Sequence, residues 1–307
     1  MSAAIPIRWP AEAIWEAVAP SLEGFTVEVL PSIDSTNTEL MRRFRGNPFG
    51  SGGSPGAAPR PEPILLVAEQ QTAGRGRLGR NWHSQRGDSL TFSLGLPLQP
   101  ADWSGLSLVV GISLAESLDP YSNHDSSSRR ISLKWPNDLW LEGPEGERKL
   151  AGILVETASL DGLRYVVIGV GINIRAAAFP SADAGVAGVS PSATKPMPGA
   201  GLEDVFPGID AAQALLTVLP PLVQAIQAFE QFGFAPFQAR FARRDVLAGR
   251  AVHLSDGTVG EAHGVAENGA LLVHTSAGMK EITSSEVSVR PAGAAPTRPL
   301  TIGGGPC

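Results

Sequence analysis

The spacing of apolar positions divides the chain into short helices and strands. Apolar residues recur with helical spacing in four segments, at residues 11–18, 40–45, 106–118 and 209–232. Short apolar runs predict three strands in the first hundred residues, at 25–30, 64–68 and 89–98. Pro220 and Pro221 lie in the middle of the last helical segment, so we expect them to kink or split that helix.

Residues 131–174 carry the clearest strand pattern. Short β-rich runs alternate there with turn sequences, among them Asp161-Gly162, and this spacing predicts an antiparallel meander rather than a parallel doubly wound sheet. Residues 249–290 show a second set of short strands, and their spacing predicts a small barrel of about five strands. The pattern therefore indicates an α+β fold with a mixed, mainly antiparallel sheet and a small C-terminal β-barrel.

Changes in composition set the expected domain limits. Residues 46–63 are so rich in glycine and proline that we interpret them as a flexible surface insertion, and residues 175–208 suggest a long loop that could act as a lid. We expect a catalytic domain at 1–245, a C-terminal domain at 246–291 and a disordered tail at 292–307.

Charge and cysteine content narrow the class of protein. The formal net charge is -6 and the pI is near 5.4, which argues against a surface made for nucleic acid. Cys307 is the sole cysteine, so the chain has no internal disulfide and suits a reducing compartment. With no signal segment or membrane span expected, we predict a cytoplasmic protein, and the five histidines show no metal-ligand spacing.

The glycine-rich loop QQTAGRGRLGRNWHS at 70–84 suggests an anion site. It places Arg75, Arg77 and Arg80 among glycines directly after a predicted strand. Glycine lets backbone N–H groups approach a phosphate, and arginine supplies forked donors for phosphate or carboxylate oxygens. A mobile loop with solvated arginines is the alternative. The GxGxxG spacing fails as a dinucleotide fingerprint because no βαβ unit follows.

Other polar residues leave two interpretations open. Thr36 and Glu39 have the spacing of a helix capping box, and the same helix N-terminus could also bind a polar ligand. Asn137 and Asp138 follow Pro136 and could simply form a turn. Lys134 and Lys149 each stand in a strand, as solvated edge residues or as site cations. Gly169, Gly171 and Asn173 indicate either a β-bulge or close approach of a ligand.

Taken in order, six segments resemble the biotin protein ligase family. They are DSTNTEL (34–40), AEQQTAGRGRLGRNWHS (68–84), LKWPNDLWL (133–141), RKLAGILVE (148–156), IGVGINI (168–174) and the small β-rich C-terminal region. The resemblance implies a catalytic domain related to lipoate ligases, followed by an SH3-like domain. It also implies a monofunctional form, because only about thirty residues precede the Ser35 motif where repressor members carry a winged helix.

The resemblance implies an ATP-dependent ligase. Biotin and MgATP would give biotinyl-5′-adenylate and pyrophosphate, and a lysine of a biotin carboxyl carrier domain would then take the biotin. The residues implied at the biotin site are Ser35, Thr36, Asn37, Gln71, Arg75, Gly76, Arg77 and Lys149. Those implied at the ATP site are Arg80, Trp82, Lys134, Asn137 and Asn173. Lys149, Arg77 and Lys134 are the implied catalytic residues, no metal-binding residue is assigned, and two roles stay open for Asp138, structural or assisting the incoming lysine.

Two other functions compete with this interpretation. A lipoate or octanoate protein ligase would share the fold and the adenylate chemistry, but the GRGRxGR and KWPND motifs favour biotin. A non-catalytic sensor of biotinyl-adenylate or nucleic acid conflicts with the acidic charge. We expect ATP, Mg2+ and biotin as substrates with no prosthetic group, a carrier protein as partner, no specific DNA or membrane binding, and a monomer or weak homodimer.

Overall fold

The computed structural model of the chain describes most of its length. The described residues are 7–46, 61–120, 130–143, 146–160, 162–176, 199–255, 257–283 and 289–291. Most of the predicted insertion at 46–63, most of the predicted lid at 175–208 and the predicted tail at 292–307 lie outside these residues. Those three predictions therefore remain predictions.

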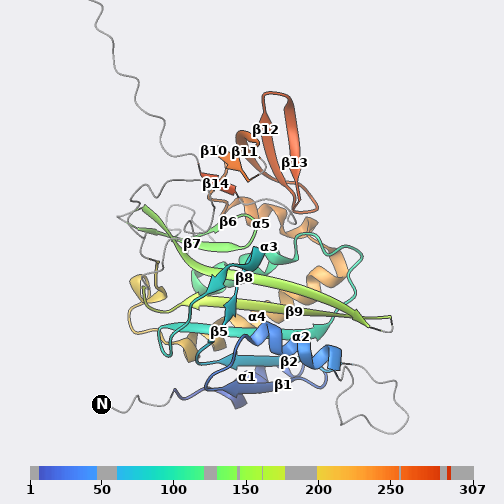
Figure 1. Cartoon of the computed structure of the whole chain (residues 1–307), viewed down its shortest axis with the longest axis vertical. Helices are drawn as coiled ribbons and strands as arrows, with labels where there is room; N and C mark the ends of the chain where they lie inside the picture. Colours follow the sequence, from blue (N-terminus) through green and yellow to red (C-terminus); the bar gives the residue numbers. More distant parts are fainter. Residues whose placement is uncertain are drawn as a thin grey trace, which may run out of the picture.

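A seven-stranded sheet forms the centre of the molecule (Figure 1). In spatial order its strands are β1 (Thr26–Leu30), β2 (Ile64–Ala68), β5 (Ser89–Pro97), β9 (Leu163–Asn173), β8 (Gly146–Leu160), β7 (Asp138–Gly143) and β6 (Ile131–Lys134). Only the β1–β2 pair is parallel among these strands, and the run from β6 to β9 is the antiparallel meander expected from the sequence. This arrangement confirms the mixed, mainly antiparallel sheet.

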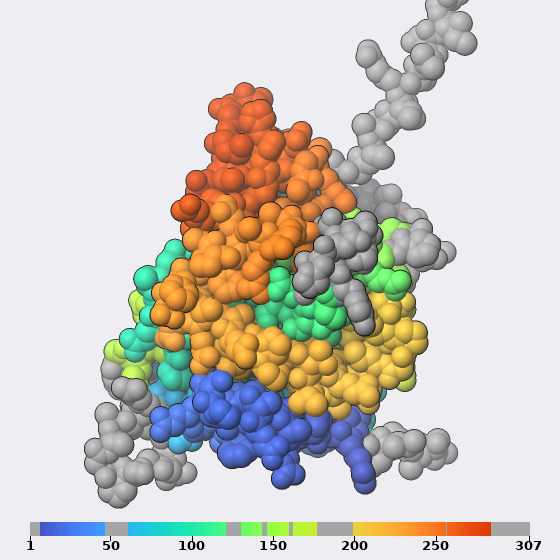
Figure 2. All heavy atoms as spheres, turned by 180° about the vertical axis from the view of Figure 1, so that it is seen from behind, coloured from blue at the N-terminus to red at the C-terminus, as the bar shows by residue number. Residues whose placement is uncertain are grey.

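The two faces of the sheet carry different layers. Helices α1 (Ala11–Val18), α3 (Leu106–Leu118) and α4 (Ala211–Phe232) cover one face, and α2 (Thr36–Gly46) covers part of the other. Figure 2 views the helical side, with blue α1 at the base and α4, in yellow to orange, across the middle. Because side chains alternate along a strand, each central strand directs some side chains toward α1, α3 and α4 and the others toward the face that carries α2.

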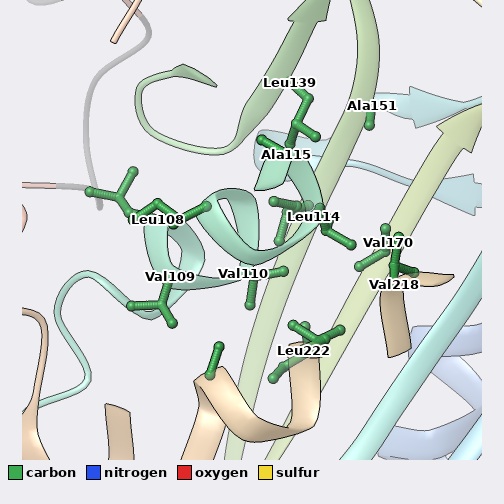
Figure 3. Close-up of a cluster of buried hydrophobic side chains, with 14 of the residues drawn as sticks. Leu108, Val109, Val110, Leu114, Ala115, Leu139, Ala151, Val170, Val218 and Leu222 are labelled. Carbon is green, nitrogen blue, oxygen red and sulfur yellow. The ribbon is translucent and has the colours of Figure 1, made fainter. Parts of the chain in front are cut away.

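Helix α3 is the core helix between the sheet and α4. Ten of its residues are buried, which follows from an apolar sequence on every side of the helix. In Figure 3 Ala115 of this helix lies beside Leu139 on the sheet side, and Val110 faces Leu222 on α4. The helix therefore ties the meander to the outer helical layer.

The sequence predicts that Pro220 and Pro221 kink or split helix α4. The helix runs continuously from Ala211 to Phe232, so a split is wrong and a kink stays a prediction. Prolines in a helix interior cost about 3 kcal/mol. Burial of eleven α4 side chains against the core offsets that cost. Within the described part of the chain, α4 is also the single helix long and apolar enough for a membrane span, but 56% of its most apolar window is buried inside the protein.

A second, five-stranded sheet lies at the end of the molecule beyond β6 (Figure 1). Its spatial order is β13 (Gly278–Ile282), β12 (Leu271–Thr275), β11 (Val259–Val265), β10 (Ala251–Leu254) and β14 (Val289–Pro291). All the strand pairs are antiparallel, as predicted for a small C-terminal β-domain. The exact domain limits, at residues 245 and 291, stay a prediction.

A buried ion pair holds the connection between the two sheets. Arg244 and Asp119 are each 3% exposed, and Arg244 Nη1 lies 3.4 Å from Asp119 Oδ2. The same guanidinium donates to the carbonyl of Ile131 at 2.9 Å, and the Asp119 carboxylate accepts from the Ile131 amide at 3.2 Å. The end of α3, the start of β6 and the chain entering the second sheet are therefore fixed by one set of charges.

We predict that Asp119→Ala lowers the free energy of unfolding by about 3–5 kcal/mol, because it leaves a buried guanidinium without its carboxylate. Urea unfolding followed by circular dichroism measures this. The control Arg42→Ala breaks the pairs of an exposed guanidinium with Asp34 and Glu39 and should cost no more than about 1 kcal/mol. Equal effects of the two changes would contradict the buried-pair argument.

Candidate active site

Three glycines form a side-chain-free floor on the α2 face of the sheet. Gly152 of β8 and Gly171 of β9 are register partners, and Gly169 lies two residues earlier on β9. A methyl group at 171 would overlap the Trp82 indole, and one at 169 would overlap the Asn37 amide. The glycines in these strands therefore mark close approach by other side chains, rather than a bulge, because β8 and β9 keep a continuous register here.

A polar cluster from the start of α2 covers one end of this glycine floor. Ser35, Thr36 and Asn37 are each at most 3% exposed. Gln71 Oε1 accepts from the Thr36 amide at 2.8 Å and from Thr36 Oγ1 at 3.1 Å. Ser93 Oγ, on β5, lies 2.7 Å from Thr36 Oγ1. Three segments far apart in the sequence thus converge on one hydroxyl.

Asn37 is held by a second set of bonds. Its Oδ1 lies 2.6 Å from Ser93 Oγ, and its Nδ2 donates to Glu156 Oε2 at 3.0 Å and to the Leu154 carbonyl at 3.2 Å. Glu156 also pairs with Arg75 at 3.5 Å. The α2 start is therefore connected to the arginine loop through a carboxylate on β8.

The capping box predicted from Thr36 and Glu39 is wrong. Ser35 occupies the capping position instead, since its Oγ accepts from the Thr38 amide at 3.4 Å. The Thr36 side chain turns inward to Gln71 and Ser93, and Glu39 pairs with Arg42 and Arg43 on the helix surface. Burial of Thr36 against the sheet took precedence over the local capping preference.

The arginine loop folds as a small hairpin. It comprises β3 (Gly74–Arg75), the 3-10 turn η1 (Arg77–Gly79) and β4 (Asn81–Trp82). The Gly76 amide donates to the Arg80 carbonyl at 2.7 Å, and the glycine at 74 is required because a methyl group there would overlap the Trp82 carbonyl. This hairpin places the Trp82 ring on Gly152 and Gly171, in the middle of the glycine floor.

A charged cluster lies at the β7–β8 end of the floor. Arg77 Nη1 lies 3.4 Å from Asn137 Oδ1, while the Asn137 Nδ2 donates to the Ile153 carbonyl at 2.8 Å. Burial lowers the pKa of the Arg77 guanidinium from its ordinary value, and the nearby Asp138 carboxylate opposes that shift. The Arg77 guanidinium is thus held beside the Asn137 amide oxygen and near the Asp138 carboxylate.

Lys149 and Lys134 have different surroundings. Lys149 Nζ lies 2.8 Å from Asp138 Oδ1 and beside Gly152, so it faces the glycine floor. Lys134 Nζ stands 4.2 Å from the centre of the Trp140 ring, in a cation–π contact. Both lysines therefore belong to the site face of the sheet, but only Lys149 reaches the floor through the contacts described.

The two remaining predicted residues, Arg80 and Asn173, differ in exposure. Arg80 is exposed, and its charge acts on Arg77. Asn173 is 1% exposed and its Nδ2 donates to the Ala200 carbonyl at 3.1 Å, so it anchors the segment that follows residue 198. The structure thus gathers the predicted residues on one face, while their assignment to biotin or to ATP stays a prediction.

Sequence reasoning missed two members of the site, Ser93 and Glu156. Ser93 is fully buried between Thr36 and Asn37, and Glu156 joins Asn37 to Arg75. A polar residue in the apolar β5 strand and a carboxylate near the end of the KLAGILVE segment were the available signals. Neither signal shows which residues Ser93 and Glu156 contact, because those residues come from α2 and from the arginine loop.

The geometry suits an elongated ligand. Alternate residues of a strand are about 7 Å apart, so the polar cluster at Gly169 and the Trp82 contact at Gly171 are neighbouring positions along β9. Lys149 lies across the sheet beside Gly152. A ligand with a neutral polar head and an anionic end could lie along this track, with Arg77 and Lys149 at the anionic end.

Two family models match the chain. The biotin/lipoate A/B protein ligase family matches residues 56–173, which contain the arginine loop and strands β5 to β9. The biotin protein ligase C terminal domain matches residues 248–290, the region of the five-stranded sheet. The second match agrees with the predicted SH3-like domain.

Curated relatives and solved structures agree with these models. The chain is 34% identical over 277 residues to the bifunctional ligase/repressor BirA of Escherichia coli, covering 88% of this chain and 76% of the relative. It is 31% identical over 268 residues to the biotin–[acetyl-CoA-carboxylase] ligase of Paracoccus denitrificans, covering 84% and 98%. The Aquifex aeolicus biotin protein ligase in complex with biotin and ATP superposes with a TM-score of 0.62 at 30% identity, covering 87% and 99%. This chain therefore belongs to the biotin protein ligase family.

Proposed function

We propose that this protein joins biotin to ATP as biotinyl-5′-adenylate and then transfers the biotin to a lysine of a biotin carboxyl carrier domain. The observation that carries the proposal is the pairing of a buried polar cluster with a cationic cluster at opposite ends of one glycine floor. The relatives named above are ligases of this kind, and one solved neighbour binds biotin and ATP.

The chemistry matches the residue types of the site. In the first step the biotin carboxylate attacks the α-phosphorus and pyrophosphate leaves, so the protein needs no nucleophile of its own. It must hold two anions together and stabilise the charge that develops on the phosphoryl oxygens. In the second step the carrier amine attacks the acyl carbon, and AMP leaves.

We assign the polar cluster to the ureido head of biotin. Thr36, Asn37 and Gln71 supply hydroxyl and amide groups, which match a neutral head that both donates and accepts hydrogen bonds. Arg75, Gly76 and Arg77 would lie over the ligand from the hairpin, and Lys149 would face its carboxylate. Ser35, Thr36 and Asn37 are buried, so a ligand whose head cannot hydrogen-bond to them would leave buried polar groups unpaired. This cost supports selection for biotin over lipoate.

We assign the charged cluster to the nucleotide. Arg80, Lys134, Asn137 and Asn173 would serve ATP, with Trp82 packing the loop between the two ligands. No group of three His, Cys, Asp or Glu side chains able to hold a metal occurs in the described residues. We expect Mg2+ to arrive with ATP, since this ion usually binds through phosphates, water and one or two carboxylates.

The remaining parts of the proposal concern partners and location. We place the reaction in the cytoplasm, because the single Cys307 and the absence of cysteine pairs suit a reducing compartment. The net charge of -6 argues against DNA as the macromolecular partner. Assembly as a monomer or weak homodimer stays a prediction.

Incubation with biotin, ATP, Mg2+ and a biotin carboxyl carrier domain should add one biotinyl group to the carrier, as read by intact mass. Lipoate or octanoate in place of biotin, with a lipoyl domain as acceptor, is the matched comparison. Faster modification of the lipoyl domain would favour the alternative ligase.

We predict that Lys149→Gln raises the dissociation constant of biotin and slows adenylation by about 10- to 100-fold. The change removes a cation that faces a carboxylate, and such charge-assisted bonds contribute about 1.5–3 kcal/mol. Isothermal titration and biotin-dependent ATP–pyrophosphate exchange measure the two effects. Lys280→Gln on β13, remote from the site face, is the control and should leave both unchanged.

We predict that Thr36→Val weakens biotin binding about tenfold and leaves the ATP KM unchanged. Valine keeps the shape of threonine but leaves the Ser93 hydroxyl and the Gln71 oxygen without this partner, a loss of about 1–2 kcal/mol. Thr217→Val on α4 removes a hydroxyl that bonds only within its helix, to the Gln213 carbonyl, and serves as control. An ATP KM that rises with the biotin dissociation constant would contradict the assignment of Thr36.

A further inference from the structure

Trp135 connects the segment 135–138 to the second sheet. Its side chain is 1% exposed, and its Nε1 donates to the Gly269 carbonyl at 3.0 Å. Trp135 directly follows β6, whereas Gly269 lies in the turn between β11 and β12, 134 residues further along the chain. A residue of the candidate active-site motif is therefore bonded to the C-terminal sheet.

The turn that supplies this carbonyl is rigid and closely docked. The Gly269 amide donates to the Ala266 carbonyl at 2.9 Å, and the Ala270 amide donates to Asn268 Oδ1 at 2.9 Å. Gly269 has a φ of 81°, and a methyl group on it would lie 2.9 Å from the Gly105 Cα at the start of α3. The Gly269 carbonyl is thus held in place relative to the core of the first domain.

The same short segment holds two of the cations of the site, Arg77 and Lys149. Asn137 Oδ1 accepts a hydrogen bond from Arg77. Two further bonds fix Asn137 to β8: its backbone carbonyl accepts from the Ile153 amide at 3.0 Å, and its Nδ2 donates to the Ile153 carbonyl at 2.8 Å. Asp138 pairs with Lys149 at 2.8 Å. Trp135 anchors the N-terminal end of this segment, and the bonds to Ile153 anchor its other end.

We propose that Trp135 is a positioning residue: through its indole bond to Gly269, the C-terminal sheet sets the placement of Asn137 and Asp138, and with them Arg77 and Lys149. The inference rests on the proposed function of the site. It assigns to the C-terminal sheet a part in adenylation that needs no contact of that sheet with either ligand. A displacement of reacting groups by about 1 Å can lower a rate about 100-fold, so one remote bond can matter for the rate.

Trp135→Phe tests this, because it removes the indole N–H and keeps most of the apolar ring. We expect biotin-dependent ATP–pyrophosphate exchange to lose about 10- to 100-fold in kcat, with a smaller change in the KM of either substrate. Gly269→Ala should give the same pattern, since the added methyl group pushes the turn away from Gly105. Trp15→Phe removes another indole-to-carbonyl bond, to Phe25 on the opposite side of the sheet, and should leave kcat unchanged.

A double variant separates positioning from general stabilisation. In an Asn137→Ala background, Trp135→Phe should lose most of its effect, because both changes act on the same segment. The proposal would be overturned if the loss of kcat in the double variant equalled the product of the losses in the two single variants. An unchanged kcat in Trp135→Phe would overturn it as well.

Hydrogen exchange gives a readout that does not depend on activity. The Ile153 amide should exchange faster in Trp135→Phe, because its acceptor is the Asn137 carbonyl, while the amides of α4 should keep their protection. Unchanged exchange at Ile153 would overturn the inference. Absence of biotin-dependent exchange of pyrophosphate in the unaltered protein would instead contradict the proposed function, and the Ile153 measurement would still decide the role of Trp135.

Discussion

The site depends on the lack of side chains at three positions of the central sheet. Gly152, Gly169 and Gly171 let Trp82 and Asn37 lie directly on the strands, at distances that a methyl group would forbid. The strands supply this flat surface because β8 and β9 pair without interruption from residue 151 to residue 172. The start of α2, the hairpin of β3 and β4, and the charged residues of β7 and β8 can therefore meet over one small area.

Positive charge in the site is held by acceptors of the protein itself. Arg77 is paired with Asn137, Lys149 with Asp138 and Arg75 with Glu156. These contacts restrict the side chains before any ligand binds, which reduces the ordering cost at the moment of binding. An anionic ligand would compete with Asn137, Asp138 and Glu156 for cations whose positions are already limited.

The two sheets are coupled through the strand that starts the meander. β6 is bonded at its start to the buried Arg244 and Asp119, and the residue after it reaches Gly269 of the second sheet. The chain leaving α5 (Gln238–Ala242) also pairs with Leu133. Because β6 leads directly into the segment that carries Asn137 and Asp138, the junction and the site share one stretch of backbone.

The sequence by itself determined where most helices and strands lie and which polar residues are candidates for the site. Apolar spacing located α3 at residues 106–118 and the antiparallel meander, and the GRGRxGR, KWPND and RKLAGILVE segments supplied the candidate cations and their neighbours. Tertiary structure decided the rest, because burial outweighs local preference. It turned Thr36 from a cap into a buried partner of Gln71 and kept α4 whole through two prolines. It alone brought Ser93, Glu156 and Gly269 to their partners, since contacts between strands far apart in the chain leave no periodic signal in the sequence.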